Sequence, residues 1–60
     1  MTNQEKAEKL RRVIELLEEV DAIQQEVFGD TDACYENHNC IQNLIEDFNC
    51  DVVEFDGATA

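Results

Sequence analysis

The sequence contains no lysine or arginine after Arg12, although 13 of its 15 aspartates and glutamates follow that residue. All four basic residues lie between positions 6 and 12, so the net charge of −11 is distributed unevenly along the chain. Such an acidic chain is repelled by the phosphate backbone of nucleic acids and by anionic membrane surfaces, which argues against binding to either. It favours a protein partner with a basic surface, because opposite charges attract and steer association.

Residues that break regular structure are also scarce. The 60 residues include no proline and only two glycines, Gly29 and Gly57, which favours long helices over a turn-rich β fold. No apolar run approaches the roughly 18 residues of a membrane-spanning helix, and the polar N-terminus lacks the apolar segment of a secretory signal. Three cysteines, an odd number, do not fit a disulfide framework; they indicate reduced thiols and predict a cytoplasmic protein.

Residues 2–28 have the composition and the end signals of one long helix. Thr2 and Glu5 have the spacing of a capping box, and Gly29 suits the position that follows a helix. The interior is rich in Glu, Leu, Lys, Arg and Gln, which are good helix formers.

The apolar residues of this first helix are spaced by three and four, which favours left-handed, bundle-like packing. The stripe consists of Leu10, Val13, Leu17, Val20 and Val27. Gln24 interrupts it, and it either lies in the stripe and helps to set the register or lies at its edge while Ile23 is buried. We favour the second interpretation.

A second, shorter helix is predicted from about residue 32 to residue 49, after a turn at residues 29–32. The face that predicts it consists of Cys34, His38, Ile41, Leu44, Ile45 and Phe48. Asn37 and Asn39 weaken its first half, so a later start, capped by one of them, is the alternative. The last residues, 50–60, are predicted to form a partly ordered, extended tail, because residues 51–55 have a β-rich composition.

Two helices joined by a short turn predict a single all-α domain, residues 1–60, folded as an antiparallel helical hairpin. The shorter second helix would leave residues 2–12, with all the basic side chains, overhanging. Two helices alone leave apolar surface in water, so we predict a homodimer in which two hairpins form a four-helix bundle. The residues expected in the core and dimer interface are Leu10, Val13, Leu17, Val20, Ile41, Ile45 and Phe48.

Four residues of the second half have side chains that bind zinc: Cys34, His38, Cys40 and Cys50. Their spacing matches none of the common zinc patterns. We therefore expect small buried thiols and a histidine at the edge of the core, with no metal or cofactor, and keep a zinc-stabilised module as the alternative. No catalytic residue is predicted, because so small a hairpin has little room for a substrate pocket. If His38 lies near acidic groups, its charged form is favoured and the dimer becomes sensitive to pH.

The opening sequence MTNQEKAEKLRRVIELLEEVDAIQQEVFGD and the size of the chain resemble the short acidic early proteins of lambdoid temperate phages. Those proteins are encoded between the exonuclease and excisionase genes. The resemblance covers the whole chain but includes no functional motif, so no site residue is carried over. It implies a bacterial cytoplasmic setting and a non-enzymatic role in the lytic–lysogenic decision or in host takeover.

Charge, size and resemblance together predict a non-enzymatic regulatory or inhibitory protein that docks a basic surface of a host protein. A purely structural oligomerisation module, in which the acidity only confers solubility, is a further alternative. The residues predicted to contact the partner are Glu36, Glu46, Asp47, Asp51, Glu54 and Asp56.

Overall fold

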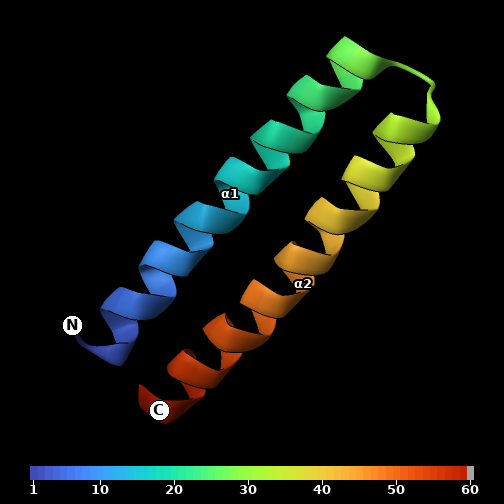
Figure 1. Ribbon diagram of the computed structural model, residues 1–60. Coiled ribbons are helices and arrows are strands. Elements are labelled where there is room, and N and C mark those ends of the chain that lie inside the picture. The colour runs from blue at the N-terminus through green and yellow to red at the C-terminus, as the bar shows by residue number, and fades with distance from the viewer. Residues whose placement is uncertain (60) are drawn as a thin grey trace.

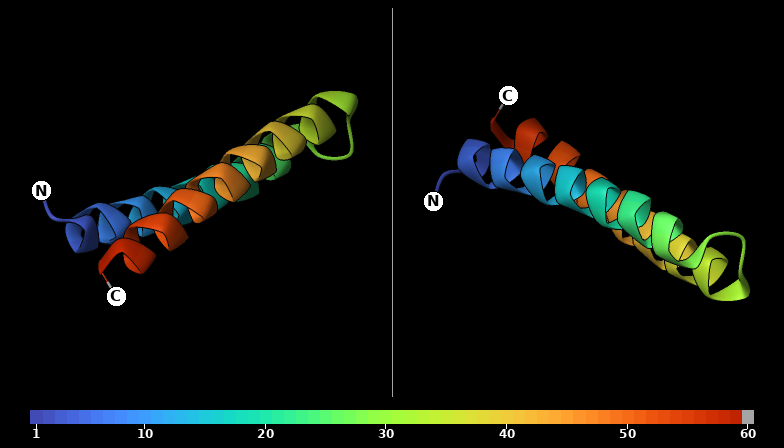
Figure 2. Two further views of the ribbon diagram at one scale, coloured as in Figure 1. Left: turned by 90° about the horizontal axis from the view of Figure 1, so that it is seen from below. Right: turned by 90° about the horizontal axis from the view of Figure 1, so that it is seen from above.

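The computed structural model describes the backbone of residues 1–59 and the side chains of residues 1–57. It consists of two helices, α1 (Asn3–Phe28) and α2 (Asp32–Thr59), joined by a short turn. They lie side by side and antiparallel, with the N-terminus and the end of α2 at the same end of a rod 43 Å long (Figures 1 and 2). The predicted all-α helical hairpin is thus confirmed. Within the described residues, no helix is long and apolar enough to cross a membrane.

Both ends of α1 lie where the local signals predict them. The Thr2 hydroxyl accepts a hydrogen bond from the backbone N–H of Glu5 at 3.1 Å, which satisfies a donor of the first turn. Gly29 ends the helix with φ 63°, and its N–H donates to the carbonyl of Gln25 at 2.8 Å. A positive φ is unstrained in glycine, which has no Cβ, so this residue allows the chain to reverse here.

Helix α2 begins at Asp32, so the early start is confirmed and the later one is wrong. Thr31 caps the helix, because its hydroxyl accepts a hydrogen bond from the backbone N–H of Cys34 at 3.2 Å. Asn37 does not act as a cap. Its side-chain amide instead donates across the hairpin to Gln24 Oε1 at 3.4 Å.

The predicted end of α2 at residue 49 and the extended tail after it are wrong, because the helix continues to Thr59. Val52 is only 7% exposed, and Phe55 is half-buried. These two side chains continue, in steps of four and three, the buried series that passes through Ile45 and Phe48. Burial against α1 favours the helix here and outweighs the local β propensity, which is strongly dependent on context.

The predicted overhang of residues 2–12 is also wrong, because the longer α2 covers this part of α1 (Figure 1). Ala7 is completely buried. The ammonium group of Lys6 lies 5.3 Å from the centroid of the Phe55 ring, and Arg11 forms an ion pair with Asp56. The basic residues therefore lie beside the C-terminal half of α2.

The seam between the helices is built from one stripe of each, spaced alternately by three and four, as in a coiled coil. The stripe of α1 consists of Ala7, Leu10, Ile14, Leu17, Asp21 and Gln24, and that of α2 of Cys34, His38, Ile41, Ile45, Phe48, Val52 and Phe55. Five of the seven predicted core residues are in it: Leu10, Leu17, Ile41, Ile45 and Phe48.

The other two predicted core residues, Val13 and Val20, lie on the flank of the seam. Val13 is half-buried and Val20 is 50% exposed. Our interpretation of Gln24 and Ile23 is wrong for the same reason, since Gln24 is half-buried in the seam and Ile23 is 59% exposed. In this part of α1 each residue of the seam therefore follows the predicted one by a single position: Asp21 lies in the seam in place of Val20, and Gln24 in place of Ile23.

Replacing Val52 by alanine tests the packing of the C-terminal part of α2. Val52→Ala removes two buried methyl groups, so we expect the free energy of unfolding to fall by about 1.5 kcal/mol, at about 0.8 kcal/mol per buried group. Val53→Ala is the matched control, because this neighbouring side chain is 70% exposed; we expect a change of less than about 0.5 kcal/mol. Urea unfolding followed by circular dichroism measures both. Equal effects would contradict the extended α2.

Candidate functional site

A buried carboxylate is the most unusual feature of the seam. Asp21 follows Leu17 in the stripe of α1 and is 6% exposed, and among the described side chains it is the one charged group that is buried. A buried charge is tolerated only where hydrogen bonds or opposite charges replace the lost water. The neighbouring polar side chains of both helices supply this replacement.

Three side chains donate hydrogen bonds to the Asp21 carboxylate. His38 Nδ1, from α2, donates to Oδ2 at 2.7 Å, and Gln24 Nε2, one turn along α1, donates to Oδ1 at 3.0 Å. Gln42 Nε2 lies 3.4 Å from Oδ2, one turn beyond His38 on α2. Gln24 also donates to the carbonyl oxygen of Cys34 at 3.4 Å, so the network connects both helices near the turn. The short contact to His38 is typical of a charge-assisted hydrogen bond.

The network keeps Asp21 ionised. Burial raises the pKa of Asp21, but hydrogen bonds from Gln24 and His38, together with the positive charge of protonated His38, outweigh burial and lower it below the ordinary value. Among the described residues, no buried side-chain nitrogen or oxygen lacks a hydrogen-bond partner. The polar layer is therefore fully satisfied, as a stable buried network requires.

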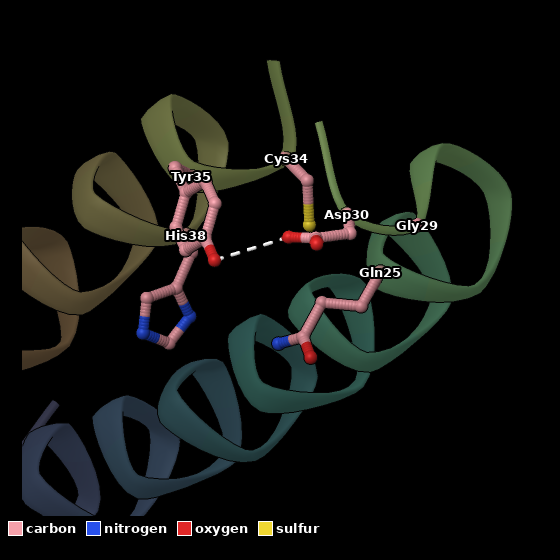
Figure 3. Close-up of a pocket in the computed structure, with 6 residues that line it drawn as sticks. All are labelled: Gln25, Gly29, Asp30, Cys34, Tyr35 and His38. Atoms are coloured by element: carbon pink, nitrogen blue, oxygen red, sulfur yellow. Dashed lines mark hydrogen bonds between the residues drawn. The ribbon is translucent and has the colours of Figure 1, made fainter. Parts of the chain in front are cut away.

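A shallow hollow of about 370 Å³ opens beside this layer, at the end of the hairpin that carries the turn (Figure 3). Its lining residues are Gln25, Gly29, Asp30, Cys34, Tyr35 and His38. The Tyr35 hydroxyl donates to Asp30 Oδ1 at 3.1 Å across its rim. The hollow is open to solvent, so it provides little shielding from water.

The hollow does not contain a cysteine nucleophile with its base. Asp21 and His38 have the relation of an orienting carboxylate to a general base. Cys34 is buried in the same helix as His38, but no hydrogen bond joins its thiol to the imidazole within the part of the chain that the structure describes. Nucleophile and base must lie within hydrogen-bond reach, so this arrangement does not activate the thiol.

The four residues of the zinc alternative do not converge. Cys34 is buried in the seam, whereas Cys40 and Cys50 are exposed on other sides of α2, and His38 is held by Asp21. Among residues 1–57, no three side chains of the types that bind metals are grouped closely enough to hold an ion.

An exposed apolar stripe runs along the flank of α1, next to the seam. It consists of Leu16, Val20, Ile23 and Val27, all of them exposed and spaced by four, three and four. A second small hollow is lined by both Val20 and Cys40, which shows that Cys40 of α2 lies on the same side of the hairpin. Leu44, one turn along from Cys40, is exposed there too. We call this side the apolar side and the opposite one, with Gln25 and Tyr35, the polar side.

The six acidic residues predicted to contact a partner do not form one patch. Asp47, Asp51 and Glu54 follow Leu44 in steps of three, four and three, so they lie on the apolar side, toward the chain termini. The remaining three are elsewhere: Glu46 is on the polar side, Asp56 forms an ion pair with Arg11, and Glu36 is near the turn, on the outer surface of α2.

The burial of Asp21 was not among the predictions from the sequence. The signal was present in the spacing, because the series from Leu10 through Ile14 and Leu17 continues in steps of four and three to Asp21 and Gln24. The predicted stripe instead follows the apolar residues Val13, Val20 and Val27, which lie on the flank of the seam. Polar residues in a series with this spacing can mark a network that sets the register of two helices.

Comparison of the chain with models of known protein families, with curated proteins and with solved structures found no match.

The lowered pKa of Asp21 predicts a loss of stability in acid. The folded chain binds this proton less readily than the unfolded chain, so the stabilisation is complete above the ordinary pKa of aspartate, about 4, and is lost as the pH falls through the lower folded-state value. The side chain in Asp21→Asn cannot ionise, so this variant lacks the pH-dependent stabilisation. The difference in free energy of unfolding between the wild type and this variant should therefore shrink from about pH 5 to about pH 2.

Urea unfolding at a series of pH values measures this difference. Glu19→Gln removes an exposed carboxylate from the same helix and controls for the change in net charge. A difference between the wild type and Asp21→Asn that stays constant over this range would contradict the stabilising role of the Asp21 network.

Proposed function

We propose that the chain is a non-enzymatic helical binding protein that forms a homodimer and docks a basic surface of another protein. The proposal that the chain docks a basic surface rests on the ion pairs that both arginines form within the hairpin. Arg11 pairs with Asp56 and Arg12 with Glu15, so two of the four positive charges are already neutralised within the hairpin. The other two are lysines near the N-terminus, and apart from His38 every other charged side chain is an aspartate or a glutamate.

The polar side offers the surface for this docking. Glu8 and Glu18 of α1 and Glu46 of α2 are exposed on it, and within the described residues none of the three forms an ion pair. Among the six acidic residues predicted from the sequence, this surface includes Glu46 and the paired Asp56. A field of one sign raises the rate at which a basic partner is met and disfavours acidic partners.

The apolar side supports the homodimer. Leu16, Val20, Ile23 and Val27 form a continuous exposed stripe. Helices in bundles bury a face that is wider than the contact between two helices. A second hairpin that packs on the apolar side would bury this exposed stripe.

The biological setting that we propose follows the resemblance of the N-terminal sequence to phage early proteins. In that setting the chain is a regulator or inhibitor that acts on a protein of the bacterial cytoplasm. A purely structural oligomerisation module would use the same apolar stripe, and the two functions differ in whether a basic partner is bound.

Capture from a bacterial lysate at low and high salt tests the docking. We expect the immobilised chain to retain a basic protein at about 50 mM salt and to release it at about 500 mM, because exposed charges are strongly screened there. The triple variant Glu8→Gln, Glu18→Gln, Glu46→Gln should lose this protein. The control is Glu19→Gln, Glu26→Gln, Glu36→Gln, which removes the same charge from the outer surface.

Retention of the same protein by both triple variants would contradict the choice of the polar side. If no salt-sensitive protein is retained by the wild type, the docking proposal fails and the structural module is favoured.

A further inference from the structure

We propose that two copies of the chain pair through their apolar sides with both turns at the same end of the dimer. The inference rests on the self-association proposed above. It adds the surface that is used, the relative direction of the two hairpins and the residues that meet across the interface.

The flank of α1 changes character along its length. The exposed apolar stripe continues toward the N-terminus through half-buried Val13 to Lys9 and Lys6, still in steps of three and four. The half nearest the turn is therefore apolar and the half nearest the termini is basic. Lys6 lies over the Phe55 ring, and among the described residues neither lysine forms an ion pair.

The flank of α2 on the same side has the complementary pattern. Beside the turn it presents the uncharged side chains Asn37, Cys40 and Leu44, and toward the termini it presents Asp47, Asp51 and Glu54. These three carboxylates have no ion-pair partner within the described part of the chain. On the apolar side, the charges without an ion-pair partner are thus positive on α1 and negative on α2.

The contacts between α1 and α2 show which residues of the two helices lie at the same height along the long axis of the hairpin, that is, at the same level. Asp21 meets His38, Gln24 meets Asn37 and Lys6 meets Phe55, so positions whose numbers add up to about 60 face each other. On the apolar side this rule puts Lys9 level with Asp51 and Lys6 level with Glu54. It also puts Leu16 level with Leu44 and Val20 level with Cys40.

A two-fold axis parallel to the helices preserves these levels between two copies. It places α1 of one copy beside α2 of the other, as in a square four-helix bundle. Lys9 then faces Asp51 of the partner subunit, and Leu16 faces Leu44 of the partner subunit. Each contact occurs twice, because a two-fold interface is self-complementary.

The opposite arrangement, with the turns at opposite ends, lacks this match. It would set Lys6 and Lys9 against Ile23 and Val27 and would place the carboxylates of α2 against uncharged side chains such as Asn37 and Cys40. Removing those charges from water without partners is costly. The charge pattern therefore selects the dimer in which both turns lie at one end.

Charge reversal tests the pairing. Lys9→Glu should weaken dimerisation on the order of tenfold in Kd, because it replaces two attractions by two repulsions at the rim. Asp51→Lys should do the same. An equimolar mixture of the two variants should form a heterodimer with about the wild-type Kd. In this heterodimer, positions 9 and 51 carry opposite charges at both places where they meet. Sedimentation equilibrium measures all three, and circular dichroism verifies that each variant is helical.

Arg12→Glu is the matched control. It makes the same change in charge three positions away on α1, but Arg12 pairs with exposed Glu15 on the outer surface. We expect it to change the Kd by less than about threefold. Equal weakening by Lys9→Glu and Arg12→Glu, or failure of the mixture to recover affinity, would overturn the proposed pairing.

The direction of the two hairpins is tested separately with spin labels. The variant Asp30→Cys, combined with Cys34→Ala, Cys40→Ala and Cys50→Ala, carries one label per copy beside the turn. Turns at the same end should give a label separation near the width of a four-helix bundle, whereas turns at opposite ends should give one near the 43 Å length of the hairpin.

The outcomes separate the two proposals. A dimer with the long separation overturns this inference but leaves the proposed homodimer in place. A wild-type chain that remains monomeric at every accessible concentration overturns both, and it would leave the apolar side to a partner of another kind. The lysate capture at the polar side tests the docking independently of either result.

Discussion

The structure depends on the burial of one stripe of side chains from each helix against the other. In a two-helix fold this seam is the only interior, so its length decides how much of the chain is ordered. The stripe of α2 extends from Cys34 to Phe55, and burial of Val52 and Phe55 requires the C-terminal segment to remain helical. That extension in turn covers Ala7 and brings Asp56 to Arg11.

The polar layer around Asp21 gives the seam its register. A purely apolar seam would tolerate a slip of one helical turn, because similar side chains would still meet. The Asp21 carboxylate, by contrast, needs donors from α2, and His38 and Gln42 are one turn apart at the right level. A slip would leave a buried charge without its partners, at a high cost in free energy. Removing water from the carboxylate is itself unfavourable, so we regard this layer as a source of specificity more than of stability.

One seam also leaves the two flanks of the hairpin with different properties. The polar side carries the closed Arg11–Asp56 pair and several exposed glutamates, whereas the apolar side carries a stripe of aliphatic residues next to unpaired charges of both signs. Self-association and docking therefore need not compete for the same surface. A small chain can combine both tasks when each uses a different flank of the same two helices.

The sequence by itself determined the elements with strong local signals. Thr2 and Gly29 mark the ends of α1 through a side-chain cap and a positive φ, and Thr31 provides the cap that begins α2. These contacts form within a few residues of each other, so they can be inferred without knowing what lies opposite. The absence of proline and the short turn were then enough to predict the hairpin.

Only the tertiary structure decided which stripe of α1 is buried and where α2 ends. The flank from Leu16 to Val27 is more apolar than the seam that includes Asp21 and Gln24, yet the flank is the exposed one. Local hydrophobicity cannot explain this choice, because the stability of a seam depends on both of its faces. His38 and Gln42 on α2 satisfy Asp21, and Val52 finds a buried place beside α1, only after the two helices have been brought together.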